Sequence, residues 1–166
     1  MIVAAIEADR SSSSYSTCVP QYWLKPLGFT QPQPHPLPDD WVSERGFEDF
    51  ELTTGPAKIQ NPPQMGRGDR VLLHGVIHSR VFAEGEILGN PKWTPDHQWG
   101  DRWPWVYAFR IDSWVPLVKD GPRTIDYAPR RAIGRVQAGG EYAGLSKQEY
   151  EIVIAALRNA PTLMCR

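Results

Sequence analysis

The chain has 166 residues, a formal net charge of −1 from 18 Lys+Arg against 19 Asp+Glu, and two cysteines. That length predicts one domain with its own core, and the balanced charge excludes a global positive field that would attract nucleic acid or anionic lipid without specificity. Cys18 and Cys165 lack the spacing of a zinc site or a disulfide framework, which favours a reducing environment. No apolar run approaches the ~20 residues of a membrane helix, and no signal-peptide pattern occurs, so we expect a soluble, unexported protein.

The N-terminal third combines one β-like stretch with a proline-rich segment. Residues 2–9 alternate in the manner of a strand and are followed by a run of serines, which predicts a first strand. Residues 20–40 hold repeated prolines, which remove backbone donors, so we expect a long loop that wraps the surface. The stretch DDWVSERGFEDF predicts a brief helix that has Asp39 or Asp40 as its N-cap and ends at Gly46.

The middle of the chain predicts short strands separated by turns. FELTTGPAKI, residues 50–59, is typical of a β stretch broken by a Gly-Pro pair. The glycine-rich turn in MGRGDRVLLHGVIH leads into a strand over residues 71–78, and SRVFAEGEILGNP supplies its partner, with Ser79 and Arg80 at the hairpin tip. WVYAFRI, residues 105–111, forms a further strand. Strands without regularly alternating helices indicate an antiparallel sheet or a small barrel.

One helix is predicted near the C-terminal end. Ser146 followed by Glu149 forms a capping box, and Pro161 lies beyond the last turn. Apolar side chains recur between them on one stripe at helical spacing, namely Tyr150, Val153, Ile154 and Leu157. We expect this stripe to lie against the sheet.

An aromatic segment raises the main functional question. The stretch WGDRWPWVYAFRIDSW contains four of the seven tryptophans. Trp105, Tyr107 and Phe109 alternate on one face of the predicted strand, and we assign them to the interior, where each large side chain contributes ~1.5–3 kcal/mol. Trp93 and Trp99 lie in a loop rich in proline and glycine. They either cover the sheet as a structural lid or hold a flat ligand, because an indole stacks on any nucleobase.

Three stretches of the chain resemble one known family: GDRVLLHGVIHSRVFAEGEILGNP, WPWVYAFRIDSWVPL and RRAIGRVQAGGEYAGLSKQEYEIVIAAL. In order, they contain a Gly-Asp-Arg turn into a strand, a strand ending in Gly-x-Pro, an aromatic strand after Trp and Pro, and a closing Leu-Ser-x-x-Glu-Tyr helix. This order of motifs resembles the EVE domain of the PUA-like superfamily, which includes YTH and ASCH domains. The resemblance covers residues 66–158. It implies one α+β domain over residues 1–166, a PUA-like pseudo-barrel of mostly antiparallel strands flanked by helices, with a Ser/Pro-rich insertion within residues 1–60.

The resemblance also implies a function. EVE domains are associated with modified DNA, modified cytosine in particular, and are often fused to restriction nucleases, whereas YTH domains read methylated adenine in RNA. By position, the family's aromatic cage falls on Trp93 and Trp99, with Trp103 behind them; its second source is Trp41 or Trp23, and the resemblance does not choose between these two. Glycines replace the family's His-Ser pair in RVQAGGEYAGLS, so the modification that is read is expected to differ.

GPRTIDYAPRRAIGR is the densest basic segment of the chain. Its arginines either hold the phosphates that flank a flipped nucleotide or form a solvated charged face. Gln137 is a candidate for reading the edge of the base, and Asp112 is either a second such reader or a strand-end turn residue. The candidate phosphate-binding residues are Arg123, Arg130, Arg131, Arg135 and, at the hairpin tip, Arg80.

Other chemistries find less support. His74 and His78 are four residues apart on a predicted strand, hence roughly 13 Å apart at ~3.3 Å per residue, which is too far to share one metal ion. No nucleophile or phosphate-loop motif occurs. Some ASCH relatives are amide hydrolases that use lysine, threonine and glutamate. The chain has these residue types close together in Lys58, Thr53, Thr54 and Glu51. Their spacing does not reproduce that family's pattern.

The sequence therefore predicts a non-enzymatic reader, without metal or cofactor, that extrudes a modified base from nucleic acid, DNA more than RNA, into an aromatic pocket. It is expected to be cytoplasmic, nucleoid-associated if bacterial, and partnered with a nuclease on another chain or domain as the sensor of a restriction or defence system. Two alternatives stay open: an ASCH-like amide hydrolase of a modified nucleoside, and a protein-interaction module.

Overall fold

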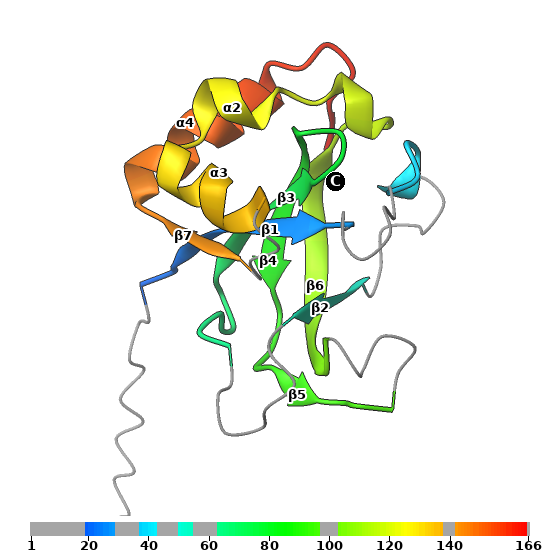
Figure 1. Cartoon of the computed structure of the whole chain (residues 1–166), viewed down its shortest axis with the longest axis vertical. Helices are drawn as coiled ribbons and strands as arrows, with labels where there is room; N and C mark the ends of the chain where they lie inside the picture. The colour runs from blue at the N-terminus through cyan, green and yellow to red at the C-terminus, as the bar shows by residue number, and fades with distance from the viewer. Residues whose placement is uncertain are drawn as a thin grey trace, which may run out of the picture.

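The computed structural model describes residues 19–28, 37–42, 50–54, 63–96, 103–137 and 142–165. Strands and helices are mixed along the chain, as predicted for an α+β protein (Figure 1). In chain order the elements are β1 (Tyr22–Leu27), β2 (Phe50–Thr54), β3 (Arg70–Gly75), β4 (Arg80–Ile87), β5 (Lys92–Trp93), β6 (Trp105–Trp114), the 3-10 turn η1 (Val118–Asp120), α2 (Thr124–Tyr127), α3 (Arg130–Gln137), β7 (Ala143–Leu145), α4 (Lys147–Arg158) and β8 (Met164–Cys165).

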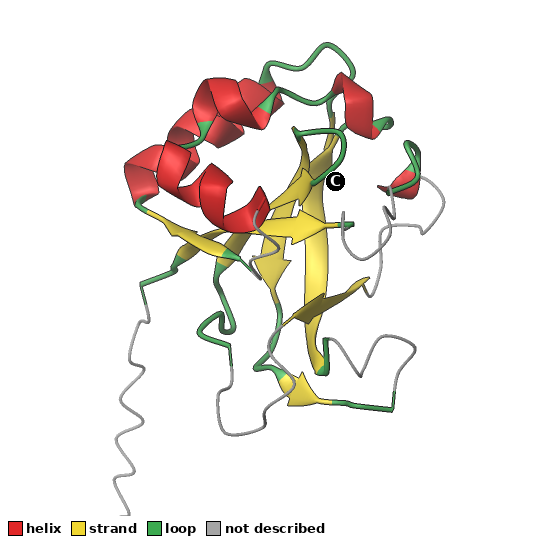
Figure 2. Ribbon diagram, in the orientation of Figure 1, coloured by secondary structure: helices red, strands yellow, loops and turns green. Residues whose placement is uncertain are grey.

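The described strands form one curled, mixed sheet (Figure 2). Its order is β2-β6-β4-β3-β1-β7, and β5 and β8 also pair with β6. Only β1 and β3 run parallel among the pairs of described strands; the other pairs are antiparallel, including the predicted β3–β4 hairpin. The predicted α+β class with a largely antiparallel sheet is thus confirmed.

The longest strand, β6, organises one half of the sheet. One of its edges pairs with β4 and then with β5, and the other edge pairs with β2 and β8. Glu84 of β4 pairs with Ser113, but the next residue, Gly85, pairs with Ile111, so Asp112 is the extra residue of a β-bulge. A Cβ on Gly85 would lie 1.9 Å from the carbonyl oxygen of Arg110. Only glycine therefore allows this close approach, and the bulge bends the strand.

The prediction of a continuous loop over residues 20–40 is wrong, because β1 lies within it and inside the sheet. A proline can occupy this strand because of the pairing pattern. The carbonyl oxygens of Gln21 and Leu27 accept from backbone N–H groups of β3 and the turn after it. Because backbone polar groups of successive residues point to opposite edges of a strand, the backbone nitrogen of Pro26 points away from β3. On that side β7 pairs only with residues 22–24. The missing N–H of Pro26 thus breaks no ladder bond.

Other predicted boundaries shift or fall outside the described residues. The strand predicted over residues 71–78 ends at Gly75, because the hairpin needs a turn in which Ser79 has a φ of 53°. Trp93 lies in β5 rather than in an irregular loop. The strand predicted over residues 2–9 and most of the helix predicted up to Gly46 lie outside the described residues, as do residues 55–59 of the predicted β stretch.

The predicted C-terminal helix is confirmed as α4. Ser146 accepts from the backbone N–H of Glu149, and the Glu149 side chain accepts from the backbone N–H of Ser146, which completes the capping box. Tyr150, Val153, Ile154 and Leu157 are its buried residues. Helices α3 and α4 both contact β1 and β7, and α4 also contacts β4 and α2. In the described ranges, no helix is long and apolar enough to cross a membrane.

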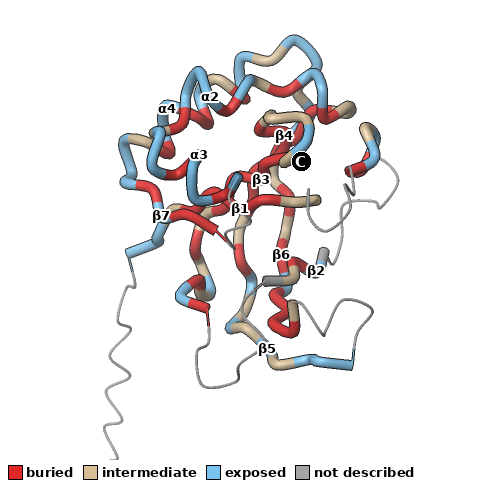
Figure 3. The backbone as a smooth tube through the Cα atoms, in the orientation of Figure 1, coloured by how far each residue is buried: buried red, intermediate tan, exposed pale blue. Residues whose placement is uncertain are grey.

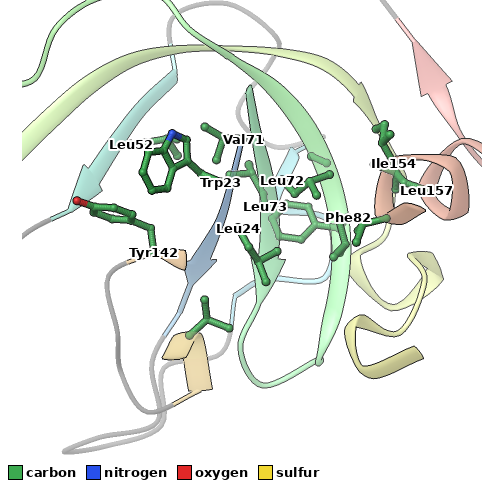
Figure 4. Packing of buried hydrophobic residues seen from close by; sticks show 14 of the residues in the cluster. Trp23, Leu24, Leu52, Val71, Leu72, Leu73, Phe82, Tyr142, Ile154 and Leu157 are labelled. Atoms are coloured by element: carbon green, nitrogen blue, oxygen red, sulfur yellow. The ribbon is translucent and has the colours of Figure 1, made fainter. Parts of the chain in front are cut away.

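The core lies between the strands and beneath the helices (Figure 3). Tyr107 and Phe109 are fully buried and Trp105 is nearly so, which confirms their assignment to the interior. Figure 4 shows Trp23 of β1 and Leu52 of β2 in the same cluster as residues of β3 and β4. Because β1 and β2 are distant in the strand order, this shared cluster reflects the curl of the sheet.

The Gly-Asp-Arg turn anchors β1 through the buried carboxylate of Asp69. Its Oδ2 accepts from Trp23 Nε1 at 2.8 Å and from the backbone N–H of Gly66 at 2.9 Å. Its Oδ1 accepts from the backbone N–H of Gln21, also at 2.9 Å. One side chain therefore joins the turn to the start of β1 and to an indole in the core.

Replacing Asp69 with asparagine is expected to lower the free energy of unfolding by about 2 kcal/mol, because the amide keeps one acceptor oxygen and turns an N–H donor toward the remaining donors. Urea denaturation measures the loss. The exposed Asp126 provides the control, since Asp126→Asn is expected to change the same quantity by less than about 0.5 kcal/mol. Equal stabilities of the two variants would contradict the anchoring role of Asp69.

Candidate nucleic-acid interface

Three tryptophans gather where β6 begins. Trp93 and Trp105 are register partners across β5 and β6, and their rings meet edge to face with centroids 5.2 Å apart and planes at 73°. Trp103 lies two residues before Trp105. Trp93 and Trp103 are half-buried, whereas Trp105 is 6% exposed. We call Trp93, Trp103 and Trp105 the aromatic cluster; the predicted cage residue Trp99 lies outside the described residues.

The indole nitrogen of Trp105 is buried, and it has no hydrogen-bond partner in the described part of the chain. An indole offers one donor and no acceptor, so only an acceptor atom can satisfy it. A buried polar group without a partner costs ~1–3 kcal/mol, which makes such groups uncommon in native cores. The aromatic cluster therefore combines partly exposed ring surface with one unsatisfied donor.

The other two predicted cage tryptophans are core residues. Trp23 is 8% exposed, and its ring meets Tyr142 edge to face at 5.1 Å. Trp41 is 6% exposed and packs edge to face on Phe82 of β4 at 5.7 Å. Trp23 stands on β1, which β3 and β4 separate from β6 in the strand order.

The predicted phosphate-binding arginines fall into two groups. Arg130 and Arg135 are exposed on α3 and form no ion pair with described residues. Arg131, also exposed, donates to the carbonyl oxygen of Gly144 at 2.9 Å and pairs with Glu149. The predicted base reader Gln137 is the exposed last residue of α3. Because α3 packs on β1 and β7, these side chains belong to a different end of the sheet from β5.

Two further arginines from that prediction flank the β3–β4 hairpin. Arg80 donates to the carbonyl oxygen of Gly121 at 2.9 Å, which occupies part of its guanidinium. Arg123 forms an isolated bridge with Arg80 and is exposed, with its Nε 4.0 Å from the carboxylate of Asp126. The described contacts therefore spread the candidate phosphate-binding arginines over α3 and the hairpin.

A polar network on β3, β4 and β6, centred on the buried Glu84, was not predicted. Arg70 pairs with the buried Glu84, and donates to Asp112 at 2.7 Å. Arg110 donates to Asp112 at 2.7 Å and to Glu86 at 2.8 Å. Asp112 is therefore neither a strand-end turn residue nor a free edge reader, since it lies inside β6 and is held by two guanidinium groups. The sequence signal that could have indicated this network is the charged residues at alternate positions of β4 and β6.

Helix α4 closes this network from above the sheet. Tyr150 donates from its hydroxyl to Glu84 at 2.9 Å, and the Ser113 hydroxyl lies 3.4 Å from the other Glu84 oxygen. Burial, together with the Glu84 charge, raises the pKa of Tyr150. Burial opposes ionisation of Asp112, but hydrogen bonds from Arg110 and Arg70 outweigh it and lower the pKa of Asp112. Every charge here has a partner, which is the pattern of a structural network rather than a reactive site.

The two predicted histidines have hydrogen-bond partners of their own, and the structure describes only some of the hydrolase candidates. His74 Nδ1 lies 2.8 Å from the hydroxyl of Thr124, and His78 Nε2 lies 3.0 Å from the carbonyl oxygen of Leu37. Where the structure is described, no group of three or more potential metal ligands occurs. Glu51 and Thr53 lie on β2, Glu51 exposed and Thr53 half-buried; of the other hydrolase candidates, Thr54 ends β2 and Lys58 lies outside the described residues.

Comparisons with known proteins bear on the fold. No protein-family model and no curated protein matches the chain. The NMR structure of Rpa0253 from Rhodopseudomonas palustris is similar at 16% identity with a TM-score of 0.52, over 83% of this chain and 93% of that one. A hypothetical protein from Leishmania major is similar at 16% identity with a TM-score of 0.54, over 84% of this chain and 96% of that one. At this identity, the likeness shows a shared fold and no function.

Proposed function

We propose that the chain is an EVE-like domain of the PUA-like superfamily that binds nucleic acid by accepting one modified base, DNA more than RNA. The observation that carries this proposal is the aromatic cluster, in which Trp93 and Trp103 are only half-buried beside a buried third indole. Flat π surfaces of this kind suit bases, and a modified base is cheaper to unstack than an ordinary one.

Charge supports a nucleic-acid partner over an apolar one. Arg130 and Arg135 project from α3 without ion pairs to described residues, so they can contact phosphates without first breaking an internal bond. Phosphate contacts position a strand, whereas base contacts select it. In this proposal α3 binds the phosphate backbone of the nucleic acid at a distance from the flipped base, and the aromatic cluster binds the base. A nuclease on another chain or domain then acts on the recognised strand.

The first test is a titration of labelled oligonucleotides that are identical except for one base: unmodified, cytosine-modified and adenine-modified DNA, and methylated RNA. Selective binding of one modified strand is expected. Trp93→Ala should weaken that binding about tenfold or more, because losing one stacked ring costs ~1–3 kcal/mol, while the melting temperature changes little. Fluorescence anisotropy measures affinity, and thermal unfolding measures stability.

The control removes an exposed aromatic ring elsewhere. Tyr127 is 44% exposed on α2, so Tyr127→Ala should leave affinity and stability close to those of the unaltered chain. Equal affinity for every strand in the panel would contradict a modified-base reader. Equal losses in the Trp93→Ala and Tyr127→Ala variants would contradict the assignment of the base to the aromatic cluster.

A further inference from the structure

Two buried indole N–H groups differ in whether the fold supplies them with a hydrogen-bond acceptor. Trp23 donates to the carboxylate of Asp69 at 2.8 Å, so the fold supplies this donor with an acceptor. Trp105 is slightly more buried, at 6% exposure against 8%, yet its nitrogen has no acceptor among the described residues. The fold satisfies one indole with a dedicated carboxylate, and it leaves the other without an acceptor among the described residues, in a ring that contacts the half-buried Trp93.

The position of Trp105 is held firmly by the sheet. Its register partners are Thr54 of β2 on one edge of β6 and Trp93 of β5 on the other, so the backbone is paired on both sides. Tyr107 and Phe109, on the same face of β6, are fully buried and continue the core from it. A donor mounted on a strand in the interior of a sheet keeps its position when a ligand arrives, which is the condition for selective recognition.

We infer that Trp105 is a specificity-determining residue, whose buried indole N–H donates to an acceptor atom on the edge of the base that stacks in the aromatic cluster. This inference rests on the proposed function. The N–H can only donate, so it accepts a carbonyl oxygen or an unprotonated ring nitrogen and rejects a base that presents an amino group at the same place. Sites built around a buried hydrogen-bonding group discriminate strongly, because the wrong partner leaves that group unpaired. Trp93, half-buried against Trp105, then supplies stacking, and Trp105 supplies selection.

The test follows the indole N–H resonance of Trp105 by NMR in the full chain, with the same oligonucleotide panel. The signal is assigned by its loss in Trp105→Phe, which keeps an aromatic ring and removes the donor. We expect it to move downfield, and its exchange with solvent to slow, when the selected oligonucleotide is added. Trp105→Phe should bind that oligonucleotide about tenfold more weakly. Trp114→Phe is the matched control, because Trp114 is a buried tryptophan at the other end of β6, and it should bind as the unaltered chain does.

The outcomes separate the inference from the proposed function. If the oligonucleotide binds and Trp93→Ala weakens it, but the Trp105 resonance stays in place, then the inference is overturned and the proposed function stands. If no strand in the panel binds, both are overturned.

Discussion

Replacing Glu84 with glutamine is expected to lower the free energy of unfolding by about 3–5 kcal/mol, the usual loss when one partner of a buried ion pair is removed. The carboxylate is 2% exposed, and both of its oxygens face donors. One oxygen receives Arg70 and the Tyr150 hydroxyl, and the other is near the Ser113 hydroxyl. An amide removes the charge that Arg70 pairs with, and it turns its own N–H donors toward one of these two sets, so the donors of that set lose their acceptor. Urea denaturation at neutral pH measures the change.

Glu86 provides a matched control two residues along the same strand. It faces the same side of the sheet and pairs with Arg110, but it is 31% exposed. Glu86→Gln is therefore expected to cost less than about 1 kcal/mol, because solvent already screens the pair. A loss in Glu84→Gln no larger than that in Glu86→Gln would contradict the desolvation of the Glu84 carboxylate.

Acidification is expected to destabilise the fold through His74 before most carboxylates titrate. Complete burial lowers the pKa of this histidine from 6.5 to about 4, and a hydrogen bond with the backbone of Arg80 opposes that shift only in part. A folded-state pKa below the unfolded value means that the unfolded chain binds the proton first. Stability is thus retained above pH 6.5 and lost as the pH falls from there toward 4. The expected loss between about pH 7.5 and about pH 4.5 is about 2.5 kcal/mol.

Removing the titrating group isolates its contribution. His74→Gln is expected to flatten the dependence of unfolding free energy on pH between about pH 7 and about pH 5, where ordinary carboxylates remain ionised in both states. His78→Gln, at the half-buried neighbour on the same hairpin, should retain the slope. An unchanged slope in His74→Gln would assign the acid sensitivity to another group.

The aromatic cluster illustrates how far residue patterns reach into a site. The family resemblance selected Trp93 and Trp103 by position, and both are half-buried in the structure. The unpartnered donor was not predictable, because alternation along β6 assigns Trp105 to the interior and says nothing of what its nitrogen meets. Which acceptors surround a buried group depends on β2 and β5, strands that are brought to β6 only by folding.

Local physics was sufficient for α4 and for the β3–β4 hairpin. A capping box, a stripe at helical spacing and a turn between alternating strands all act within a few residues, so the sequence by itself determined these elements. The identity of β1 as an inner strand was decided by tertiary structure, because Pro26 is tolerated only where β7 no longer pairs. The pairing of Glu84 with Tyr150, and the burial of Trp23 against Asp69, were decided in the same way. Such contacts join residues distant in the chain, and a pattern of neighbours along the sequence carries no information about which distant partner satisfies them.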